Sequence, residues 1–287
     1  MLIMDKQKRL NNVENLVFDL DGTLLNSKKK INDSTVVVLK ELKKHKNIFI
    51  ATGRPWYFAQ KEYNQLNLDT PIMSCNGSLI YHPKLHKSIY KNPFSKEIVN
   101  YIYSLLLKYN LTFLIYTEDT MHRFYPKDKS NWIKWQDQEN ELAAKNERTN
   151  FVDYHLESIT NFQTFNEEVF KFLIIKSESN SADVELFLDA IKDANVYAVA
   201  SQNTVVDIMP VGSDKGSAIK TLKELNYIND NVIVFGDASN DLEMFNIAKH
   251  SVAMGQSEEY IKSKADFVIG KNDTDAIADF LKENFDI

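Results

Sequence analysis

Short apolar runs alternate, toward both ends of the chain, with stretches whose apolar residues recur at helical spacing. The run 16–20 is followed by a stretch, 34–44, in which Val38 and Leu42 fall on one helix face, as in an amphipathic helix. The same pattern predicts strands at 47–51, 71–75, 232–235, 251–254 and 267–269, and helices over 214–225 and 274–285. Strands that are apolar on both faces and alternate with helices predict an α/β fold with a doubly wound parallel sheet.

The middle of the chain, 82–209, has a different pattern and is richer in aromatic residues. We expect a helix over 95–109, a hairpin from 111–117 and 120–125, and further strands at 169–176, 196–200 and 205–209. This mixture predicts a separate α+β domain over 82–209, inserted into a core formed by 1–81 and 210–287. Pro83 and Pro210 would mark the two crossings.

Composition and charge exclude several classes of protein. Of the 287 residues, 44% are hydrophobic and 26% are charged, which is typical of a folded globular chain. The formal net charge of −6 gives no general attraction for nucleic acid or anionic membranes. The single cysteine, Cys75, cannot form an internal disulfide and fits a reducing compartment. The N-terminal apolar run is too short for a signal peptide, and no apolar stretch approaches a membrane span. We therefore expect a cytoplasmic protein with no nucleic-acid or membrane partner.

Two carboxylates follow the first predicted strand. Asp19 and Asp21 stand in the segment F-D-L-D-G-T-L at 18–24. Two acids placed where a strand becomes a loop suit a divalent cation and leave an oxygen free to attack or to move a proton. The alternative is a solvated acidic strand end closed by Gly22. The apolar run before the pair and the Gly-Thr after it favour a functional site.

Two further polar segments stand where a strand is expected to end or a helix to begin. Thr52-Gly53-Arg54 offers a hydroxyl and backbone N–H groups to an anion, although an ordinary N-cap threonine would look the same. Lys215 opens a predicted helix, where a cation opposes the helix dipole. That position indicates contact with a phosphate or a carboxylate, and a plain surface lysine is the alternative.

The last polar segment, G-D-A-S-N-D at 236–241, follows an apolar strand. Asp237 can complete a site for a hard cation, and Asn240 and Asp241 lie one turn further on; the alternative is a tight turn with an Asx cap. Because ligands bind at the carboxyl ends of parallel strands, the four segments would bring three acids, a hydroxyl and a lysine to one edge of the sheet. Such a set of groups suits phosphoryl transfer.

The order D-x-D-G-T-L, T-G-R, D-K-G and G-D-x-x-N-D resembles the haloacid dehalogenase superfamily, and its Cof-type phosphatases in particular. That branch has a Rossmann-like core and a large α/β cap of the C2 (IIB) type. The cap is inserted between the second and third segments, which fits the long stretch between Asn76-Gly77 and Lys215. The resemblance extends over essentially the whole chain, and all four segments are intact.

The resemblance implies a role for each acid. Asp19 would be the nucleophile that forms an aspartyl-phosphate, and Asp21 would protonate the leaving oxygen and then activate water. Mg²⁺ would be held by Asp19, Asp237 and the backbone carbonyl of Asp21. Asp241 would support the waters on the metal and Lys215.

The resemblance also implies which residues bind the substrate. The expected phosphate-binding residues are Thr52, Gly53, Lys215 and Asn240. Arg54 and Asn76 follow core strands and are expected to contact the rest of the substrate. Residue type alone adds four candidates in the inserted domain, namely His122, Arg123, Trp132 and Trp135, although aromatic and histidine residues there are more often structural.

The function expected from the resemblance is a Mg²⁺-dependent phosphomonoesterase that acts on a small phosphorylated metabolite. Sugar phosphates come first, and FMN or pyridoxal phosphate form a second substrate class. A phosphomutase would use the same aspartyl-phosphate. A phospho-accepting regulator of the receiver type also places acids, Thr and Lys at strand ends, but it needs no inserted lid. We expect a monomer or a weak homodimer.

Overall fold

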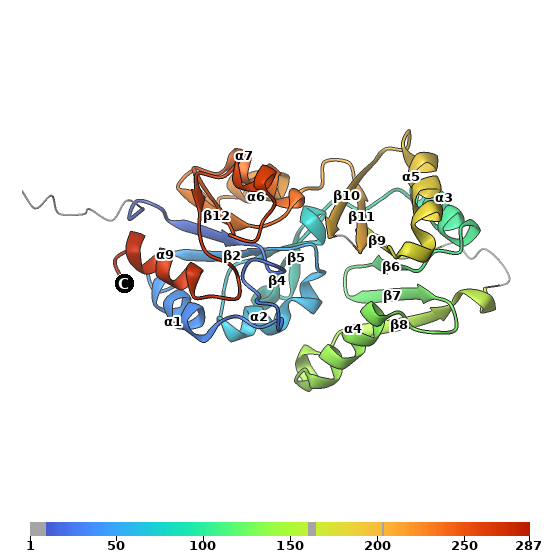
Figure 1. Cartoon of the computed structure of the whole chain (residues 1–287), viewed down its shortest axis with the longest axis horizontal. Helices are drawn as coiled ribbons and strands as arrows, with labels where there is room; N and C mark the ends of the chain where they lie inside the picture. Colours follow the sequence, from blue (N-terminus) through green and yellow to red (C-terminus); the bar gives the residue numbers. More distant parts are fainter. Residues whose placement is uncertain (1–9, 160–164, 203) are drawn as a thin grey trace, which may run out of the picture.

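The chain forms two parts, each built on its own β-sheet, as Figure 1 shows. The computed structural model describes residues 10–159, 165–202 and 204–287; the N-terminal apolar run considered above lies outside these ranges. The larger sheet has the order β14-β13-β12-β1-β2-β3-β4-β5. Its strands are β1 (Asn15–Phe18), β2 (Asn47–Ala51), β3 (Ile72–Ser74), β4 (Leu79–His82), β5 (Lys87–Lys91), β12 (Val232–Gly236), β13 (His250–Ala253) and β14 (Phe267–Val268).

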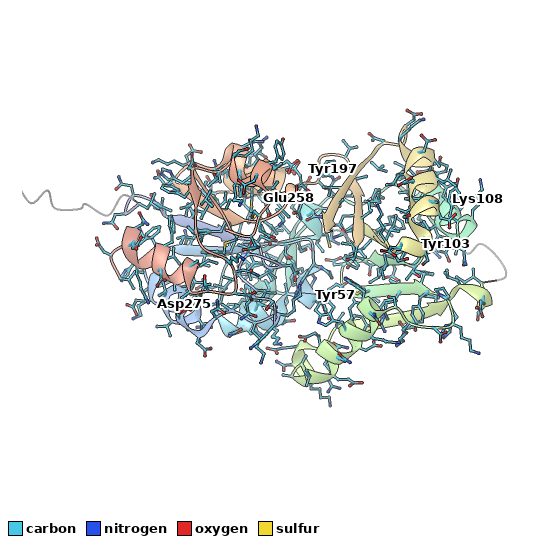
Figure 2. All side chains as sticks on the ribbon, viewed as in Figure 1. Tyr57, Tyr103, Lys108, Tyr197, Glu258 and Asp275 are labelled. Atoms are coloured by element: carbon cyan, nitrogen blue, oxygen red, sulfur yellow. The ribbon has the colours of Figure 1, made fainter. Side chains whose placement is uncertain are left out.

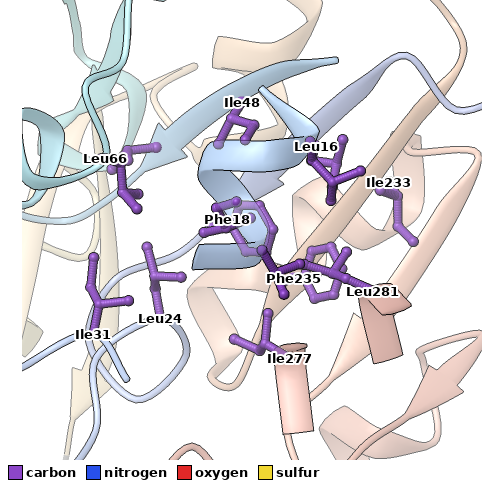
Figure 3. Close-up of a cluster of buried hydrophobic side chains, with 14 of the residues drawn as sticks. Leu16, Phe18, Leu24, Ile31, Ile48, Leu66, Ile233, Phe235, Ile277 and Leu281 are labelled. Atoms are coloured by element: carbon purple, nitrogen blue, oxygen red, sulfur yellow. The ribbon is translucent and has the colours of Figure 1, made fainter. Parts of the chain in front are cut away.

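The main sheet is doubly wound, as predicted, because alternate residues of each strand pack under different helices. In β1, Leu16 and Phe18 belong to one buried cluster and Val17 to another. Figure 3 shows the first cluster, where Phe18 stacks on Phe235 of the neighbouring strand with ring centroids 4.4 Å apart. Helices α1 (Asp33–Leu42), α2 (Gln60–Gln65) and α9 (Ala276–Asn284) contribute to this cluster, and α6 (Lys215–Glu224), α7 (Leu242–Ile247) and α8 (Glu259–Lys262) to the other.

Two antiparallel strands extend the main sheet in a way that the apolar pattern did not predict. The strands from β14 to β3 run parallel, whereas β4 pairs antiparallel with β3, and β5 with β4. The chain reverses after β3 through left-handed backbone at Cys75, Asn76 and Gly77, whose φ values are 52°, 52° and 93°. Strand β5 lies within 82–209, which we had placed in the inserted domain, yet it pairs with the main sheet. The domain boundaries themselves stay a prediction.

The inserted part, which we call the cap, is built on a six-stranded mixed sheet in the order β10-β11-β9-β6-β7-β8. The predicted hairpin is confirmed: β6 and β7 pair antiparallel, with Phe113 opposite Phe124. The strands are β6 (Phe113–Tyr116), β7 (Thr120–Tyr125), β8 (Asn150–His155), β9 (Lys171–Ile175), β10 (Val196–Gln202) and β11 (Val205–Pro210), and the helices are α3 (Lys96–Lys108), α4 (Asn131–Leu142) and α5 (Ser181–Ile191). Helices α3 and α5 pack over one face of this sheet.

The other face of the cap sheet packs against the main part. Leu114 and Leu173 of the cap share a buried cluster with Tyr57 and Cys75 of the main part. Figure 2 places Tyr57 and Tyr197 at the junction of the two parts, and the Tyr197 hydroxyl donates to Glu243 Oε1 at 3.0 Å. The inner face of the cap therefore closes over the main part. Among the residues that the structure describes, no helix combines the length and apolarity needed to cross a membrane.

Candidate active site

Three carboxylates meet where β1 and β12 end. The two strands are parallel neighbours with Phe18 opposite Phe235, so Asp19 and Asp237 leave the sheet at the same edge. Asp241, at the end of the short turn Ser239–Asp241, comes within reach of both. One oxygen from each of Asp19, Asp237 and Asp241 lies within 4.8 Å of the others. The structure therefore joins segments that are more than two hundred residues apart in the sequence.

Lys215 connects two of these carboxylates. Its Nζ lies 2.5 Å from Asp19 Oδ1 and 2.6 Å from Asp241 Oδ1, and the lysine is 1% exposed. Lys215 is the first residue of α6, and the side chain of Asp214 caps this helix by accepting from the N–H of Ser217 at 2.7 Å. The position that looked unfavourable for a lysine is thus compensated by an N-cap and by two buried anions.

Asp241 also shapes the loop that carries Asp237. Its Oδ2 accepts from the backbone N–H groups of Asp237 and Ala238 at 2.8 and 3.0 Å. Both oxygens of Asp241 are therefore engaged, one by Lys215 and one by the loop. Asp237 Oδ1 accepts from the Thr23 hydroxyl at 3.0 Å. Of the three acids, Asp19 and Asp237 thus keep more oxygen lone pairs for a ligand.

Burial and crowding disturb the ionisation of this cluster. Burial raises the pKa of Asp19 to about 7 in spite of the opposing effect of Lys215. Burial, together with the charges of Asp19 and Asp241, raises the pKa of Asp237 to about 8. One lysine does not balance three clustered acids, of which Asp19 and Asp241 are buried and Asp237 is partly buried, so the cluster gains from a further cation. Carboxylate oxygens are the donors that Mg²⁺ prefers, and the residues present therefore fit the expected metal.

The carboxylate of Asp21 turns to a separate set of cations. Arg54 donates to both of its oxygens, from Nε at 2.6 Å and from Nη2 at 2.8 Å, and Lys29 Nζ donates to Oδ1 at 2.8 Å. Although burial opposes ionisation, these cations hold the pKa of Asp21 well below its usual range. Arg54 is itself held on its other side by Glu62, at 3.6 Å. Asp21 is thus a carboxylate in the substrate-free protein.

The remaining predicted residues form a buried polar layer beside the acids. The Thr52 hydroxyl accepts from the N–H of Arg54 at 3.1 Å and does not cap a helix, since α2 begins only at Gln60. Asn240 Nδ2 donates to Asn76 Oδ1 at 3.1 Å. Thr52, Asn76 and Asn240 are all at least nine-tenths buried. Because the N–H of Asn76 donates to the carbonyl of Thr52 at 3.0 Å, Asn76 links the second and fourth sequence segments.

A cavity of about 320 Å³ lies between these residues and the cap. From the main part it is lined by Asp19, Asp21, Thr52, Gly53, Arg54 and Asn240, among others. From the cap it is lined by Tyr116, Trp132, Trp135, Lys171, Leu173, Val205 and Asp207. Two of the four cap candidates, Trp132 and Trp135, therefore face the site.

The other two cap candidates do not line this cavity. Arg123 is paired with Asp153 at 2.6 Å and Asp137 at 2.8 Å within the cap. His122 Nδ1 lies 3.2 Å from the hydroxyl oxygen of Tyr154. Both side chains are more than nine-tenths buried among cap residues, which is the structural alternative noted for residues of these types.

Sequence reasoning missed three charged residues that line the cavity, namely Lys29, Lys171 and Asp207. Lys29 stands in a run of three lysines, which reads as a solvated loop. Lys171 and Asp207 interrupt strands that are otherwise apolar, V-F-K-F-L-I-I and V-V-D-I-M. A single charge at an inward position of a buried strand is a usable signal, although it does not say what the charge contacts.

Comparison with known proteins shows which family the chain belongs to. A relative from Mycoplasma pneumoniae is 31% identical over 278 residues, which are 94% of this chain and 96% of that protein. The pyridoxal phosphate phosphatase of Escherichia coli is 28% identical over 273 residues, covering 93% and 96%. A solved haloacid dehalogenase-like hydrolase from Bacteroides thetaiotaomicron superposes with a TM-score of 0.78 at 26% identity, covering 95% of this chain and 100% of that one. The model of the haloacid dehalogenase-like hydrolases matches residues 16–281, and the chain belongs to this family.

Proposed function

We propose that this chain is a Mg²⁺-dependent phosphatase that hydrolyses small organic phosphate monoesters through a phosphoenzyme on Asp19. The observation that carries the proposal is the buried contact of Lys215 with Asp19 and Asp241, at 2.5 and 2.6 Å, beside Asp237. A nucleophilic carboxylate needs a fixed position and cations that stabilise the transferring group. In this cluster Lys215 fixes the position of Asp19. The stabilising cations would be Lys215 itself and the metal that the acids fit.

Two half-reactions complete the hydrolysis. An Asp19 oxygen forms a bond to phosphorus while the bond from phosphorus to the ester oxygen breaks, and Asp21 gives a proton to the leaving alcohol. Water then attacks phosphorus, Asp21 takes its proton, and the bond between phosphorus and Asp19 breaks. Asp21 starts as a carboxylate held by Arg54 and Lys29, so these contacts have to open and Asp21 has to take up a proton from solvent before it can deliver one to the leaving alcohol.

The other polar residues bind and orient the phosphoryl group. Mg²⁺ would be held by Asp19, Asp237 and the carbonyl of Asp21, and it would neutralise charge on the phosphoryl oxygens. Asp241 supports the site from outside, because both of its oxygens are already engaged. We expect Lys215 and the Thr52 hydroxyl to contact the phosphoryl oxygens.

The shape and lining of the cavity bear on the substrate class. Its volume of about 320 Å³ lies at the lower end of ordinary ligand sites, which favours a leaving group smaller than that of FMN. Trp135 packs edge-on against Phe58 and Trp132, with ring centroids 5.8 and 5.9 Å away, and all three line the cavity. Aromatic side chains bind planar rings by stacking and edge contacts. The expected sugar phosphates remain candidates, and this wall is a reason to place arylmethyl phosphates such as pyridoxal phosphate ahead of them.

The reaction class is tested by measuring phosphate release with and without Mg²⁺. The panel holds p-nitrophenyl phosphate, sugar phosphates, pyridoxal phosphate and FMN, with Asp19→Asn as the inactive variant. We expect Mg²⁺-dependent release that Asp19→Asn abolishes, together with a labelled phosphoenzyme in the wild type. Folded protein that binds Mg²⁺ but releases no phosphate from any ester would refute the proposal. Transfer back to the substrate would then point to a mutase, and a stable phosphoprotein to a regulator.

The substrate class is tested with Trp135→Leu. For benzyl phosphate we expect KM to rise about tenfold, which is the effect of losing one aromatic contact of roughly 1.4 kcal/mol. For glycerol phosphate, which has no ring, KM should change by less than about threefold. Trp56→Leu is the matched control, because Trp56 stacks on Tyr81 at 3.8 Å and does not line the cavity. Equal changes for the two esters in Trp135→Leu would exclude a ring-binding wall.

A further inference from the structure

Two buried charges of the cap, Lys171 and Asp207, lie directly above the core loop that carries Gly53. They stand on the neighbouring antiparallel strands β9 and β11, where Asp207 is opposite Leu173, and both line the cavity. Each is 1% exposed, and Lys171 Nζ lies 2.8 Å from Asp207 Oδ1. A buried ion pair between strands of an apolar sheet is weak evidence for stability, because desolvation offsets most of its attraction. Its position at the cavity calls for a functional explanation.

Lys171 contacts the core as well as the cap. Its Nζ donates to the backbone carbonyl of Gly53 at 2.8 Å. A Cβ built on Gly53 would lie only 3.2 Å from Nζ and 3.1 Å from Asn76 Oδ1, so the absence of a side chain at Gly53 allows the lysine this close. An ammonium group has three N–H donors. The two named oxygens occupy at most two of them, and the third is available at the wall of the cavity.

Asp207 has an acceptor left over in the same place. Its Oδ2 accepts from Asn76 Nδ2 at 2.9 Å, and Asn76 in turn accepts from Asn240. Its Oδ1 is buried and ion-paired with Lys171 at 2.8 Å, and a carboxylate oxygen can accept a second donor, which none of the described residues supplies. Buried oxygens in native proteins nearly always have a hydrogen-bond donor. A donor from a bound substrate would complete this one.

The pair thus presents one N–H donor and one carboxylate acceptor side by side, which is the complement of a hydroxyl group. We propose that Lys171 and Asp207 form a hydroxyl-recognition site for the leaving group, which selects phosphate esters whose alcohol carries a further hydroxyl. This inference rests on the proposed phosphatase function and adds a selectivity to it. The phosphoryl end is already served by Lys215 and Thr52 in the core, so the cap pair is free to contact the other end of the substrate.

The experiment compares matched pairs of esters on the full-length protein with Mg²⁺. Pyridoxine 5′-phosphate is paired with benzyl phosphate, and glycerol phosphate with propyl phosphate; in each pair only the first carries additional hydroxyl groups. Poorly hydrolysed esters are measured as competitors of p-nitrophenyl phosphate. We expect the wild type to favour the hydroxylated ester of at least one pair by about 10- to 100-fold in kcat/KM, since a hydrogen bond to a charged group has that value.

Lys171→Met should reduce that preference to within about threefold, mainly by raising KM for the hydroxylated ester. Asp207→Asn should reduce it partly. The double variant Lys171→Met with Asp207→Leu removes both charges together and guards against misfolding from one unpaired charge. Lys91→Met is the control, because Lys91 pairs with Glu118 and Glu168 and does not line the cavity; it should keep the wild-type preference.

Three results would overturn the inference. The first is a wild type with no preference in either pair, and the second is a preference that survives both Lys171 variants. The third is an equal loss for both members of a pair, which would mean that Lys171 binds the phosphoryl group or only fastens the cap. A failure of the proposed function looks different, because then no ester is hydrolysed and Asp19→Asn changes nothing.

Discussion

Gly22 lies against the side chain of Asp237, and replacing it with alanine should displace this proposed ligand of the metal. A Cβ built on Gly22 would lie 2.3 Å from Asp237 Oδ2, 2.7 Å from its Cγ and 2.8 Å from Oδ1, at a φ of +87°. Ordinary contact begins near 3.4 Å, so the carboxylate has to move by about 1 Å. The left-handed backbone adds a strain of about 1–2 kcal/mol.

Gly212→Ala separates the two effects. Gly212 has a φ of +81°, but none of the described residues has an atom within 4 Å of its built Cβ, so this variant carries the strain without the displacement. Both variants should lose a few degrees in Tm. Only Gly22→Ala should raise the Mg²⁺ concentration for half-maximal activity by about 10- to 100-fold, and its kcat should fall about 100-fold, as for a ligand misplaced by 1 Å. The same Mg²⁺ dependence in both variants would refute the placement of Asp237 on the metal.

Three other predictions concern the charges of the site. Lys215→Met should lower the free energy of unfolding by about 3–5 kcal/mol, because it leaves buried carboxylates without their cation; a urea titration that shows less than about 1 kcal/mol would contradict this. Since burial raises the pKa of Asp19 to about 7 and of Asp237 to about 8, the metal-free fold holds protons that the unfolded chain has lost. Its free energy of unfolding should therefore fall as the pH rises from about 5 to 8, and Mg²⁺ should raise Tm more at pH 8 than at pH 6; a stabilisation by Mg²⁺ that is independent of pH would be the contrary outcome. Arg54→Met should let the pKa of Asp21 rise from its lowered value; because Asp21 acts as an acid in the first half-reaction, the limb of the kcat/KM profile that falls with rising pH should move to higher pH, and an unmoved limb would separate Asp21 from that titration.

The parallel core could be predicted because its information is local. Each strand is an apolar run that ends in a polar segment, and the parallel arrangement carries those ends to one edge. Asp19, Asp237 and Lys215 therefore come together wherever the sheet forms, which explains why their convergence followed from order and spacing alone. The reversal into β4 and β5 depends instead on left-handed backbone at Cys75 and Asn76. Asn76-Gly77 is a turn signal that marks the end of the run 71–75, but it does not show that the chain returns as strands, so the sequence pattern did not reveal β4 and β5.

The cap residues that line the cavity could not be predicted from local sequence in this way. Lys171 and Asp207 are 36 positions apart in the sequence. The pairing of β9 with β11 brings them together, and the packing of the cap on the core brings them to Gly53. The same reasoning explains why His122 and Arg123 were poor candidates: a polar residue in a strand is informative only when the face it points from is known. Alternation within the cap strands supplies that face, because Phe172 and Ile208 pack under α3 and α5 while their neighbours Lys171 and Asp207 point the other way. The core residues that match the family's motifs thus lie in short contiguous segments of the sequence. Selectivity, as we propose it, depends on single inward charges on cap strands, and substitutions there should change the substrate without changing the reaction.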